Sequence, residues 1–135
     1  MNKRVLAVDD NDDMLTIVEF AFAHEGYEFA SAHSHAEMTA QLSGPLPDLI
    51  IVDLMLPGVN GYQLIEQLQD DARTRDIPVI VVTAKTERIY CRISEDLGAA
   101  RHFIKPFHPD ELVIEAGLIL GTHEAVASGV AASEQ

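Results

Sequence analysis

The sequence predicts an α/β fold in which a doubly wound, five-stranded parallel sheet carries five helices on its two faces. Five short apolar runs recur along the chain, each with the length of a strand that is buried on both sides. A segment with helical periodicity or helix-capping residues follows each run. This alternation predicts a parallel sheet, because parallel strands are joined by crossover helices whose right-handedness leaves few topologies.

The first part of the pattern contains two strands and two helices. Residues 5–8 form an apolar run, and residues 11–25 carry helical periodicity that ends at Gly26, a typical residue after a helix end. Residues 27–32 predict a weaker strand. Residues 34–42 begin with a capping box, a serine with a glutamate three positions later, so we expect a helix there.

The middle of the chain holds the strongest signal for a buried strand. Residues 49–52 are Leu-Ile-Ile-Val and run directly into Asp53. A turn rich in proline and glycine over 56–61 precedes a helix over 62–70. Residues 78–82 predict a fourth strand.

The last part of the pattern completes the sheet and its cover. We expect a helix over 86–97 whose apolar stripe is formed by three residues spaced four apart, Ile89, Ile93 and Leu97. Residues 102–104 predict a short fifth strand. Pro109 suits the first position of a last helix over 109–120.

The length and composition fit one globular domain over residues 1–121, followed by a flexible tail or linker stub over 122–135. The chain has 9 basic and 22 acidic residues, so its formal net charge is −13. This charge argues against direct binding to nucleic acids or insertion into membranes, and it suits a protein that holds a cation. The single cysteine, Cys91, and the lack of a long apolar segment indicate a soluble, cytoplasmic protein.

Polar residues stand where four of the five predicted strands end. Asp9 and Asp10 follow the first strand, Asp53 the third, Thr83 the fourth and Lys105 the fifth. A single aspartate at a strand end can instead cap the next helix. In open α/β sheets, however, ligands bind beyond the carboxyl ends of the strands, and chance is a poor explanation for five polar groups there.

Three clustered carboxylates repel one another, and a hard divalent cation relieves that repulsion. Oxygen ligands favour Mg²⁺, which keeps several waters and leaves room for a phosphoryl group. Asp53 would then act as a carboxylate nucleophile that forms an aspartyl phosphate, with Lys105 offsetting the phosphoryl charge and Thr83 donating a hydrogen bond.

The chain resembles the receiver domains of two-component response regulators over about residues 3–120. The resemblance rests on Asp9-Asp10, on the segment from Asp53 to Gly61 (DLMLPGVNG), and on Thr83-Ala84 and Lys105-Pro106-Phe107, in this order and with these gaps. It implies a flavodoxin-like sheet with strand order 2-1-3-4-5. It also implies a cis peptide bond between Lys105 and Pro106.

The resemblance implies a role for each site residue. Asp53 would be the phosphate acceptor, and Asp10 and Asp53 would bind Mg²⁺ with the backbone carbonyl of Met55. Asp9 would act through a metal-bound water, Thr83 would be the switch hydroxyl, and Lys105 the cation that faces the phosphate. A histidine kinase or a histidine phosphotransfer protein would be the donor, and the signal would pass to a downstream protein that the sequence does not name. The domain would be no enzyme beyond catalysing its own phosphorylation and dephosphorylation, and a monomer or a weak, phosphorylation-dependent dimer.

One position departs from the family pattern. The family usually has tyrosine or phenylalanine three residues before the lysine, where this chain has His102. Phe103 should point to the other face of its strand, because side chains alternate along a strand. Either His102 performs the inward swing of the switch or the coupling differs. A histidine there would also make the output surface sensitive to pH, against the plainer interpretation of a surface histidine.

Two surfaces are candidates for partner binding. In the first helix Leu15, Val18 and Phe22 have core spacing, which leaves a second stripe of Met14, Ile17 and Phe20 beside the acidic edge. This stripe is either a wider core face or, with Pro106, a docking surface for the kinase.

Five of the nine basic residues fall between positions 85 and 105, and Arg88 and Arg92 lie one helical turn apart. With His102 they form a candidate output surface, against the plainer interpretation of a solvated helix face. The pair His33 and His35 suggests a metal site only weakly, because it lies next to a helix start on a polar surface.

Two alternative functions come from other classes. A phosphatase with an aspartate nucleophile needs a second aspartate two residues later, where this chain has Met55. A phosphorylation-independent pseudo-receiver would act only as an interaction module, and only His102 favours it. The sequence therefore favours a phospho-accepting receiver.

Overall fold

The computed structural model describes residues 2–56, 58 and 60–121. Strands and helices alternate along this part of the chain as β1 Arg4–Val8, α1 Asp12–His24, β2 Glu28–Ala32, α2 His35–Leu42, β3 Leu49–Asp53, α3 Gly61–Asp70, β4 Val79–Thr83, α4 Arg88–Asp96, β5 Arg101–Ile104 and α5 Pro109–Leu120. Each predicted element exists, and its bounds agree with the prediction to within two residues. The expected tail over 122–135 and two positions of the expected 56–61 turn lie outside the described residues.

The five strands form one parallel sheet in the order β2-β1-β3-β4-β5, as predicted. Strands β1, β3 and β4 are central, and all five residues of β3 and of β4 are buried. This explains why their sequences are almost continuously apolar, since both faces of a central parallel strand are covered.

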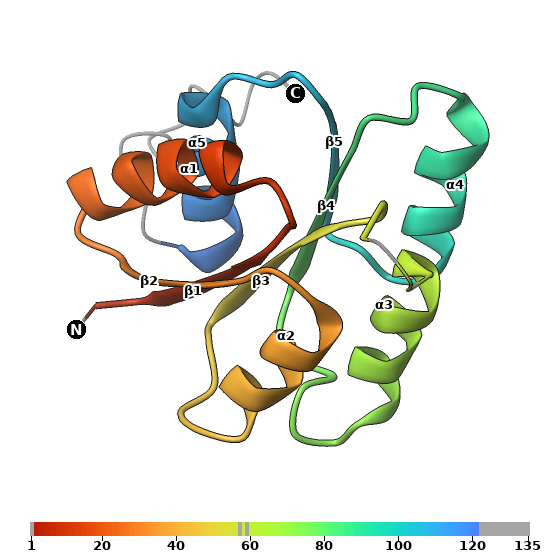
Figure 1. Cartoon of the computed structure of the whole chain (residues 1–135), viewed down its shortest axis with the longest axis horizontal. Helices are drawn as coiled ribbons and strands as arrows, with labels where there is room; N and C mark the ends of the chain where they lie inside the picture. Colours follow the sequence, from red (N-terminus) through yellow and green to blue (C-terminus); the bar gives the residue numbers. More distant parts are fainter. Residues whose placement is uncertain (1, 57, 59, 122–135) are drawn as a thin grey trace.

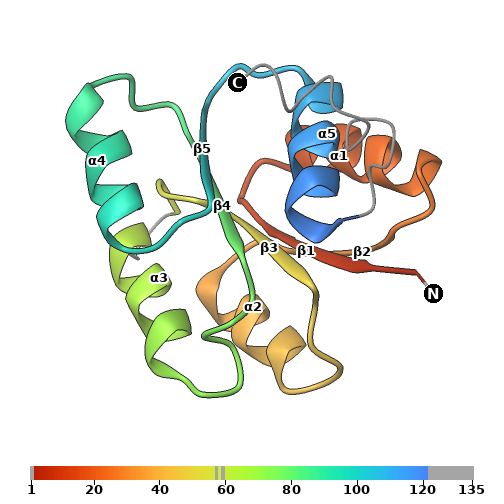
Figure 2. The ribbon, with the colours of Figure 1, turned by 180° about the vertical axis from the view of Figure 1, so that it is seen from behind.

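Two groups of helices cover the two faces of the sheet (Figures 1 and 2). Helices α1 and α5 lie on one face and pack against Val5, Ala7 and their neighbours in β3 and β4. Helices α2, α3 and α4 lie on the other face, where α2 and α3 bury their leucine, isoleucine and methionine side chains against Leu6 and Val8. Successive residues of β1 thus serve opposite cores, as the two-residue period of a strand requires.

Individual residues determine where the helices that follow the carboxyl edge of the sheet begin. The side chain of Asn11 accepts a hydrogen bond from the backbone N–H of Met14 and caps α1, so neither Asp9 nor Asp10 is used as a cap. The start of α3 lies against the residue that follows Asp53. A Cβ atom on Gly61 would lie 2.5 Å from the Cα of Leu54, so only glycine fits there without displacing that backbone.

The predicted apolar stripe of α4 is wrong in its first residue. Ile89 is 55% exposed, Ile93 and Leu97 are half-buried, and the buried position of α4 is Ser94. Side-chain hydrogen bonds and ring contacts attach this helix to its neighbours, which a count of apolar spacing does not detect.

Candidate functional site

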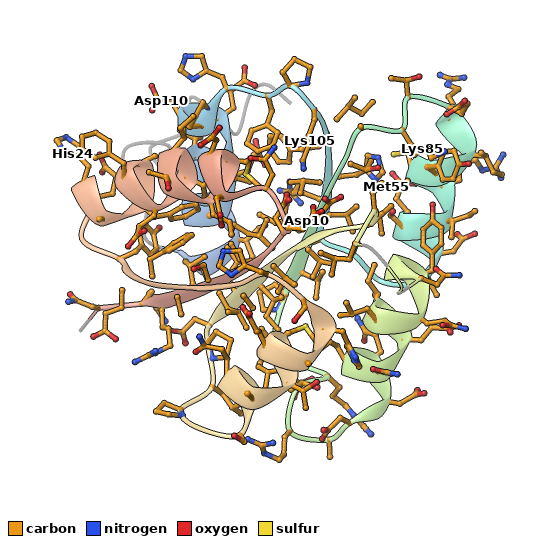
Figure 3. The ribbon with its side chains drawn as sticks, in the orientation of Figure 1. Asp10, His24, Met55, Lys85, Lys105 and Asp110 are labelled. Carbon is orange, nitrogen blue, oxygen red and sulfur yellow. The ribbon has the colours of Figure 1, made fainter. Side chains whose placement is uncertain are left out.

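The ends of β1, β3, β4 and β5 meet at the carboxyl edge of the sheet. The pairing of Val8 with Val52 places Asp9 and Asp53 side by side, and the pairing of Thr83 with Ile104 places Lys105 next to the end of β4. Figure 3 shows Asp10, Met55 and Lys105 together at this edge, although they come from three different connections. The structure therefore brings the predicted polar residues into one site.

A buried ion pair network forms the centre of this site. The Nζ atom of Lys105 lies 2.7 Å from Oδ2 of Asp9 and 3.3 Å from Oδ2 of Asp53, so one ammonium donates to two carboxylates. Both aspartates are buried, whereas Lys105 is partly exposed. The lysine thereby joins the ends of β1, β3 and β5, and the peptide bond that follows it, Lys105–Pro106, is cis, as the resemblance implies.

Each of the two buried carboxylates is also fixed by a backbone donor. Oδ1 of Asp9 accepts from the N–H of Asn11, and Oδ1 of Asp53 accepts from the N–H of Met55, both at 2.9 Å. Each hydrogen bond holds the aspartate side chain against the backbone of the residue two positions later. The oxygen orientation of both aspartates is thus set before any ligand binds.

Burial and charge act in opposite directions on this network. Burial raises the pKa of Asp9, and the nearby charge of Asp53 raises it further, while the hydrogen bonds from Lys105 and Asn11 lower it by less. Burial alone would lower the pKa of Lys105, but its hydrogen bond to Asp9 and the negative charges of both aspartates raise it above its ordinary value. The lysine is therefore firmly charged, and the buried carboxylate of Asp9 depends on that charge.

Three carboxylates converge beside the lysine. Asp9, Asp10 and Asp53 can each place one oxygen within 4.8 Å of the other two, and Asp10 is exposed while its two neighbours are buried. One ammonium does not neutralise three carboxylates, so the cluster keeps an excess of negative charge. The atoms that could bind a metal ion there are all carboxylate oxygens. This donor set fits a hard divalent cation that enters from the exposed Asp10 side.

Thr83 is fully buried at the end of β4. Its Oγ1 atom accepts a hydrogen bond of 3.0 Å from the backbone N–H of Lys85. The hydroxyl hydrogen is not used in this bond and is available to another acceptor.

His102 is not a plain surface residue. It faces α4, where its Nδ1 atom lies 3.1 Å from Oγ of Ser94, and its Nε2 atom is buried. Burial lowers the pKa of His102, and the charge of Glu95 offsets this only in part. Phe103 packs on the opposite face, against the α1/α5 core, as the strand period predicts.

The second stripe of α1 is exposed at two of its three positions. Phe20 is 76% and Ile17 54% exposed, whereas Met14 packs partly against the core. The interpretation as a wider core face is therefore wrong for Ile17 and Phe20. A groove of about 570 Å³ runs from Met14 and Ile17 to Lys105 and Pro106, so these two residues of the stripe are continuous with the site, while Phe20 lines a neighbouring groove with Ile17.

The basic residues of the 85–105 segment separate into different environments. Arg88 and Arg92 are exposed on α4, whereas Arg101 forms an ion pair with Glu115 of α5 and Lys105 belongs to the site. Sequence reasoning missed Ser94, whose burial inside a polar helix has no periodic signal.

His33 and His35 do not form a metal pair. The two ring nitrogens of His33 contact the carboxylates of Asp12 in α1 and Glu37 in α2, while His35 contacts Gln67. These carboxylates raise the pKa of His33. The histidine therefore acts as a bridge between the starts of two helices.

Comparison with known proteins gives a consistent answer. A family model described as the response regulator receiver domain matches residues 5–116. The chain is 39% identical over 113 residues to the phosphate regulon transcriptional regulatory protein PhoB of Klebsiella pneumoniae, covering 84% of this chain and 49% of that protein. It is 35% identical over 116 residues to the response regulator SaeR of Staphylococcus aureus, covering 86% and 50%.

Solved structures agree with these relatives. The chemotaxis response regulator CheY4 of Vibrio cholerae superposes with a TM-score of 0.82 at 25% identity, covering 89% of this chain and 100% of that one. A CheY-like receiver domain protein of Methanospirillum hungatei gives 0.82 at 26%, covering 93% and 98%. The chain spans about half the length of the curated relatives it matches. Among the described residues no helix is long and apolar enough to cross a membrane.

Proposed function

Because the chain belongs to the response regulator receiver domain family of two-component signal transduction, we propose that it accepts a phosphoryl group on Asp53 and switches a protein-binding surface. Receiver domains are signalling domains rather than enzymes that turn over a substrate. The observation that carries the proposal is the buried carboxylate of Asp53, which lies 3.3 Å from the ammonium of Lys105 within a cluster of three aspartates.

The proposed reaction is an in-line transfer from a phosphohistidine of the partner kinase or phosphotransfer protein. A carboxylate oxygen of Asp53 forms the new bond to phosphorus, and the phosphorus–nitrogen bond of the donor breaks. The bonding electron pair returns to the imidazole nitrogen of the donor, which takes a proton from solvent as needed. Lys105 remains charged throughout and offsets the negative charge on the phosphoryl oxygens.

Asp10 and Asp53, with Asp9 through a bound water, would hold Mg²⁺ in this proposal, together with the backbone carbonyl of Met55. When bound, Mg²⁺ supplies two positive charges that allow an anionic phosphoryl group to approach three carboxylates. Asp9 and Lys105 orient each other at 2.7 Å and keep the ammonium directed at the acceptor. Thr83 donates its hydroxyl hydrogen to a phosphoryl oxygen.

The proposed kinase-docking surface consists of Met14, Ile17, Phe20 and Pro106. Exposed apolar side chains next to the site fit an amphipathic partner helix. Asp13 lines the groove, and α1 and α5 carry acidic residues but no lysine or arginine, so basic residues on the partner suit the part of the groove away from Lys105. Replacing Phe20 by glutamate should leave the free energy of unfolding within about 0.5 kcal/mol of wild type, because the ring is exposed. The same change should strongly slow transfer from the cognate kinase, and lost folding would contradict this assignment.

The proposed output surface includes Arg88 and Arg92 of α4 with the neighbouring His102. Both arginines are exposed, and the helix that carries them has few buried apolar anchors. Reversing both charges should weaken binding of the downstream protein without changing phosphorylation. Unchanged partner binding would remove the two arginines from the surface.

The decisive test is the intact mass of the protein after incubation with Mg²⁺ and acetyl phosphate. We expect a gain of one phosphate that is absent in Asp53→Asn and in samples without Mg²⁺. A protein that binds neither Mg²⁺ nor phosphate would instead be a pseudo-receiver. Continuous turnover of a phosphoester would indicate a phosphohydrolase.

A further inference from the structure

A continuous chain of contacts links Thr83 to α4. The backbone N–H of Lys85 donates to Oγ1 of Thr83 at 3.0 Å, and the Nζ atom of the same lysine lies 5.5 Å from the ring centroid of Tyr90. Tyr90 belongs to the first turn of α4. Figure 3 shows Lys85 beside this helix, on the far side of the sheet edge from Lys105. One residue thus touches both the switch hydroxyl, through its backbone, and the helix, through its side chain.

The contacts continue from Tyr90 across the inner face of α4. Its ring stacks on Tyr62 of α3, with centroids 6.4 Å apart and planes 2° from parallel. Its carbonyl accepts a hydrogen bond from Oγ of Ser94 at 2.9 Å. Since the single hydroxyl hydrogen of Ser94 is used there, the Nδ1 atom of His102 must carry the proton in its contact with Ser94. The Nε2 atom of His102 is then a bare acceptor.

Some buried polar atoms at the inner face of α4 lack hydrogen-bond partners. In the part of the chain that the structure describes, two buried side-chain polar atoms have no hydrogen-bond partner, the hydroxyl of Tyr62 and Nε2 of His102. Both belong to side chains that contact residues of α4. Loss of the contacts with Tyr90 and Ser94 would free both rings to turn these atoms toward water, so new hydrogen bonds would partly offset the lost packing. The contact is therefore suited to two alternative arrangements.

We propose that Lys85 and Tyr90 relay the turn of Thr83 to α4, and that the Ser94–His102 hydrogen bond is the latch that this movement releases. The proposal rests on the proposed phosphorylation of Asp53 and describes how that site is read. When Thr83 rotates to donate to a phosphoryl oxygen, the N–H of Lys85 loses its acceptor and the residue moves. The ammonium then leaves the ring of Tyr90, and α4 shifts away from Tyr62 and His102.

The relay gives His102 a different part from that of an aromatic switch residue. Its ring does not need to move into a vacated space, because its neutral form is held by Ser94 until α4 moves. The direction of the signal is therefore from the β4–α4 connection into the helix, and then to β5. Exposure of the inner face of α4 would alter the surface that carries Arg88 and Arg92.

Hydrogen–deuterium exchange of α4, measured by mass spectrometry with and without acetyl phosphate and Mg²⁺, tests the relay. Intact mass in the same samples reports phosphorylation separately. In wild type we expect phosphorylation to speed exchange in α4 by about tenfold, as for a local opening equilibrium. Lys85→Gln and Tyr90→Leu should gain phosphate equally but show at most about a twofold change in exchange.

Conservative variants separate a relay from a general loss of structure. Lys85→Arg keeps a cation over the ring and Tyr90→Phe keeps the stacked ring, so both should retain the wild-type response. Asp96→Asn, an exposed change in the same helix, should also retain it. A full response in Lys85→Gln and Tyr90→Leu, or no response in phosphorylated wild type, would overturn the relay and leave the proposed function standing. A wild-type protein that gains no phosphate would overturn both.

Discussion

Helices α3 and α4 cover the same face of the sheet, yet they are attached to it by different kinds of contact. Helix α3 buries Leu64, Ile65 and Leu68 in the apolar core. Helix α4 has Ser94 as its only fully buried residue, and its further contacts are the half-buried Ile93, ring stacking and hydrogen bonds. The difference separates a helix whose start packs against Leu54, the residue after Asp53, from one that we expect to open with a smaller loss of apolar contact.

The largest effect should come from removing an apolar anchor of α3. Ile65→Ala deletes a fully buried side chain, so we expect a loss of about 2–5 kcal/mol in the free energy of unfolding, measured in urea. The matched change in α4, Ile89→Ala, removes an exposed side chain and should cost less than about 0.5 kcal/mol. Equal losses for the two variants would contradict the comparison.

A second effect concerns the contact that holds the start of α3 against β3. In Gly61→Ala the added Cβ meets the Cα of Leu54 at 2.5 Å and its carbonyl oxygen at 2.8 Å, both of them backbone atoms. We expect a loss of about 1–3 kcal/mol in the free energy of unfolding, because backbone must shift to relieve the overlap. Acetyl phosphate should also phosphorylate this variant more slowly, since the displaced backbone follows Asp53.

Gly44→Ala is the control for this change. Its Cβ would lie 3.7 Å from the nearest backbone oxygen, an ordinary contact, and its φ is not positive. We expect no loss of stability, and a gain of up to about 1 kcal/mol from the smaller entropy of the unfolded chain. A similar loss in both glycine variants would mean that general glycine effects, rather than the α3 contact, determine the result.

A smaller and more local effect should follow from Ser94→Ala. The change removes the acceptor of the Nδ1 proton of His102, which should cost about 1 kcal/mol. Because α4 has no other fully buried anchor among the described residues, amide exchange should accelerate in α4 while α3 stays protected. Equal acceleration in α3 and α4 would show that the two helices open as one unit.

These two helices also show how far the sequence predicts the structure. The strands and the convergence of Asp9, Asp53, Thr83 and Lys105 follow from apolar runs and from the residues at their ends, whereas the strand order rests on the resemblance to receiver domains. The attachment of α3 follows from the same rule, because its buried residues are leucine and isoleucine at helical spacing. Apart from the strand order, each of these features can be inferred from the type of individual residues and from their spacing along the sequence.

The attachment of α4 could not be predicted in this way. Its apolar residues predict a core stripe that includes Ile89, but the buried position is a serine whose hydrogen-bond partner is on β5. The ring of Tyr90 packs on Tyr62, which is 28 positions earlier in the chain. Such pairwise contacts depend on the placement of two elements, and hydrophobic periodicity carries no information about them.

The stability contributed by two histidines should depend on pH in opposite directions. His102 faces α4, and His33 bridges α1 and α2. Burial lowers the pKa of His102 below its ordinary value of 6.5, so the unfolded chain binds its proton more readily than the folded one. The folded state is therefore not penalised above about pH 6.5, and it loses stability as the pH falls toward the lowered pKa. Hydrogen bonds and ion pairs with Glu37 and Asp12 raise the pKa of His33, so its contribution is fully present below pH 6.5 and is lost as the pH rises through the raised pKa.

Urea unfolding at several pH values between 5 and 8 distinguishes the two histidines. Relative to wild type, His102→Gln should lose less stability on acidification, because it removes a group that resists protonation in the folded state. His33→Gln should lose more on acidification, since it lacks the bridge that becomes stronger as the ring is protonated. The effect of His33 should be small and should fade in high salt, because its ion pairs are exposed. Changes of the same sign in both variants would show that the environments of the two histidines do not differ in the way that their contacts indicate.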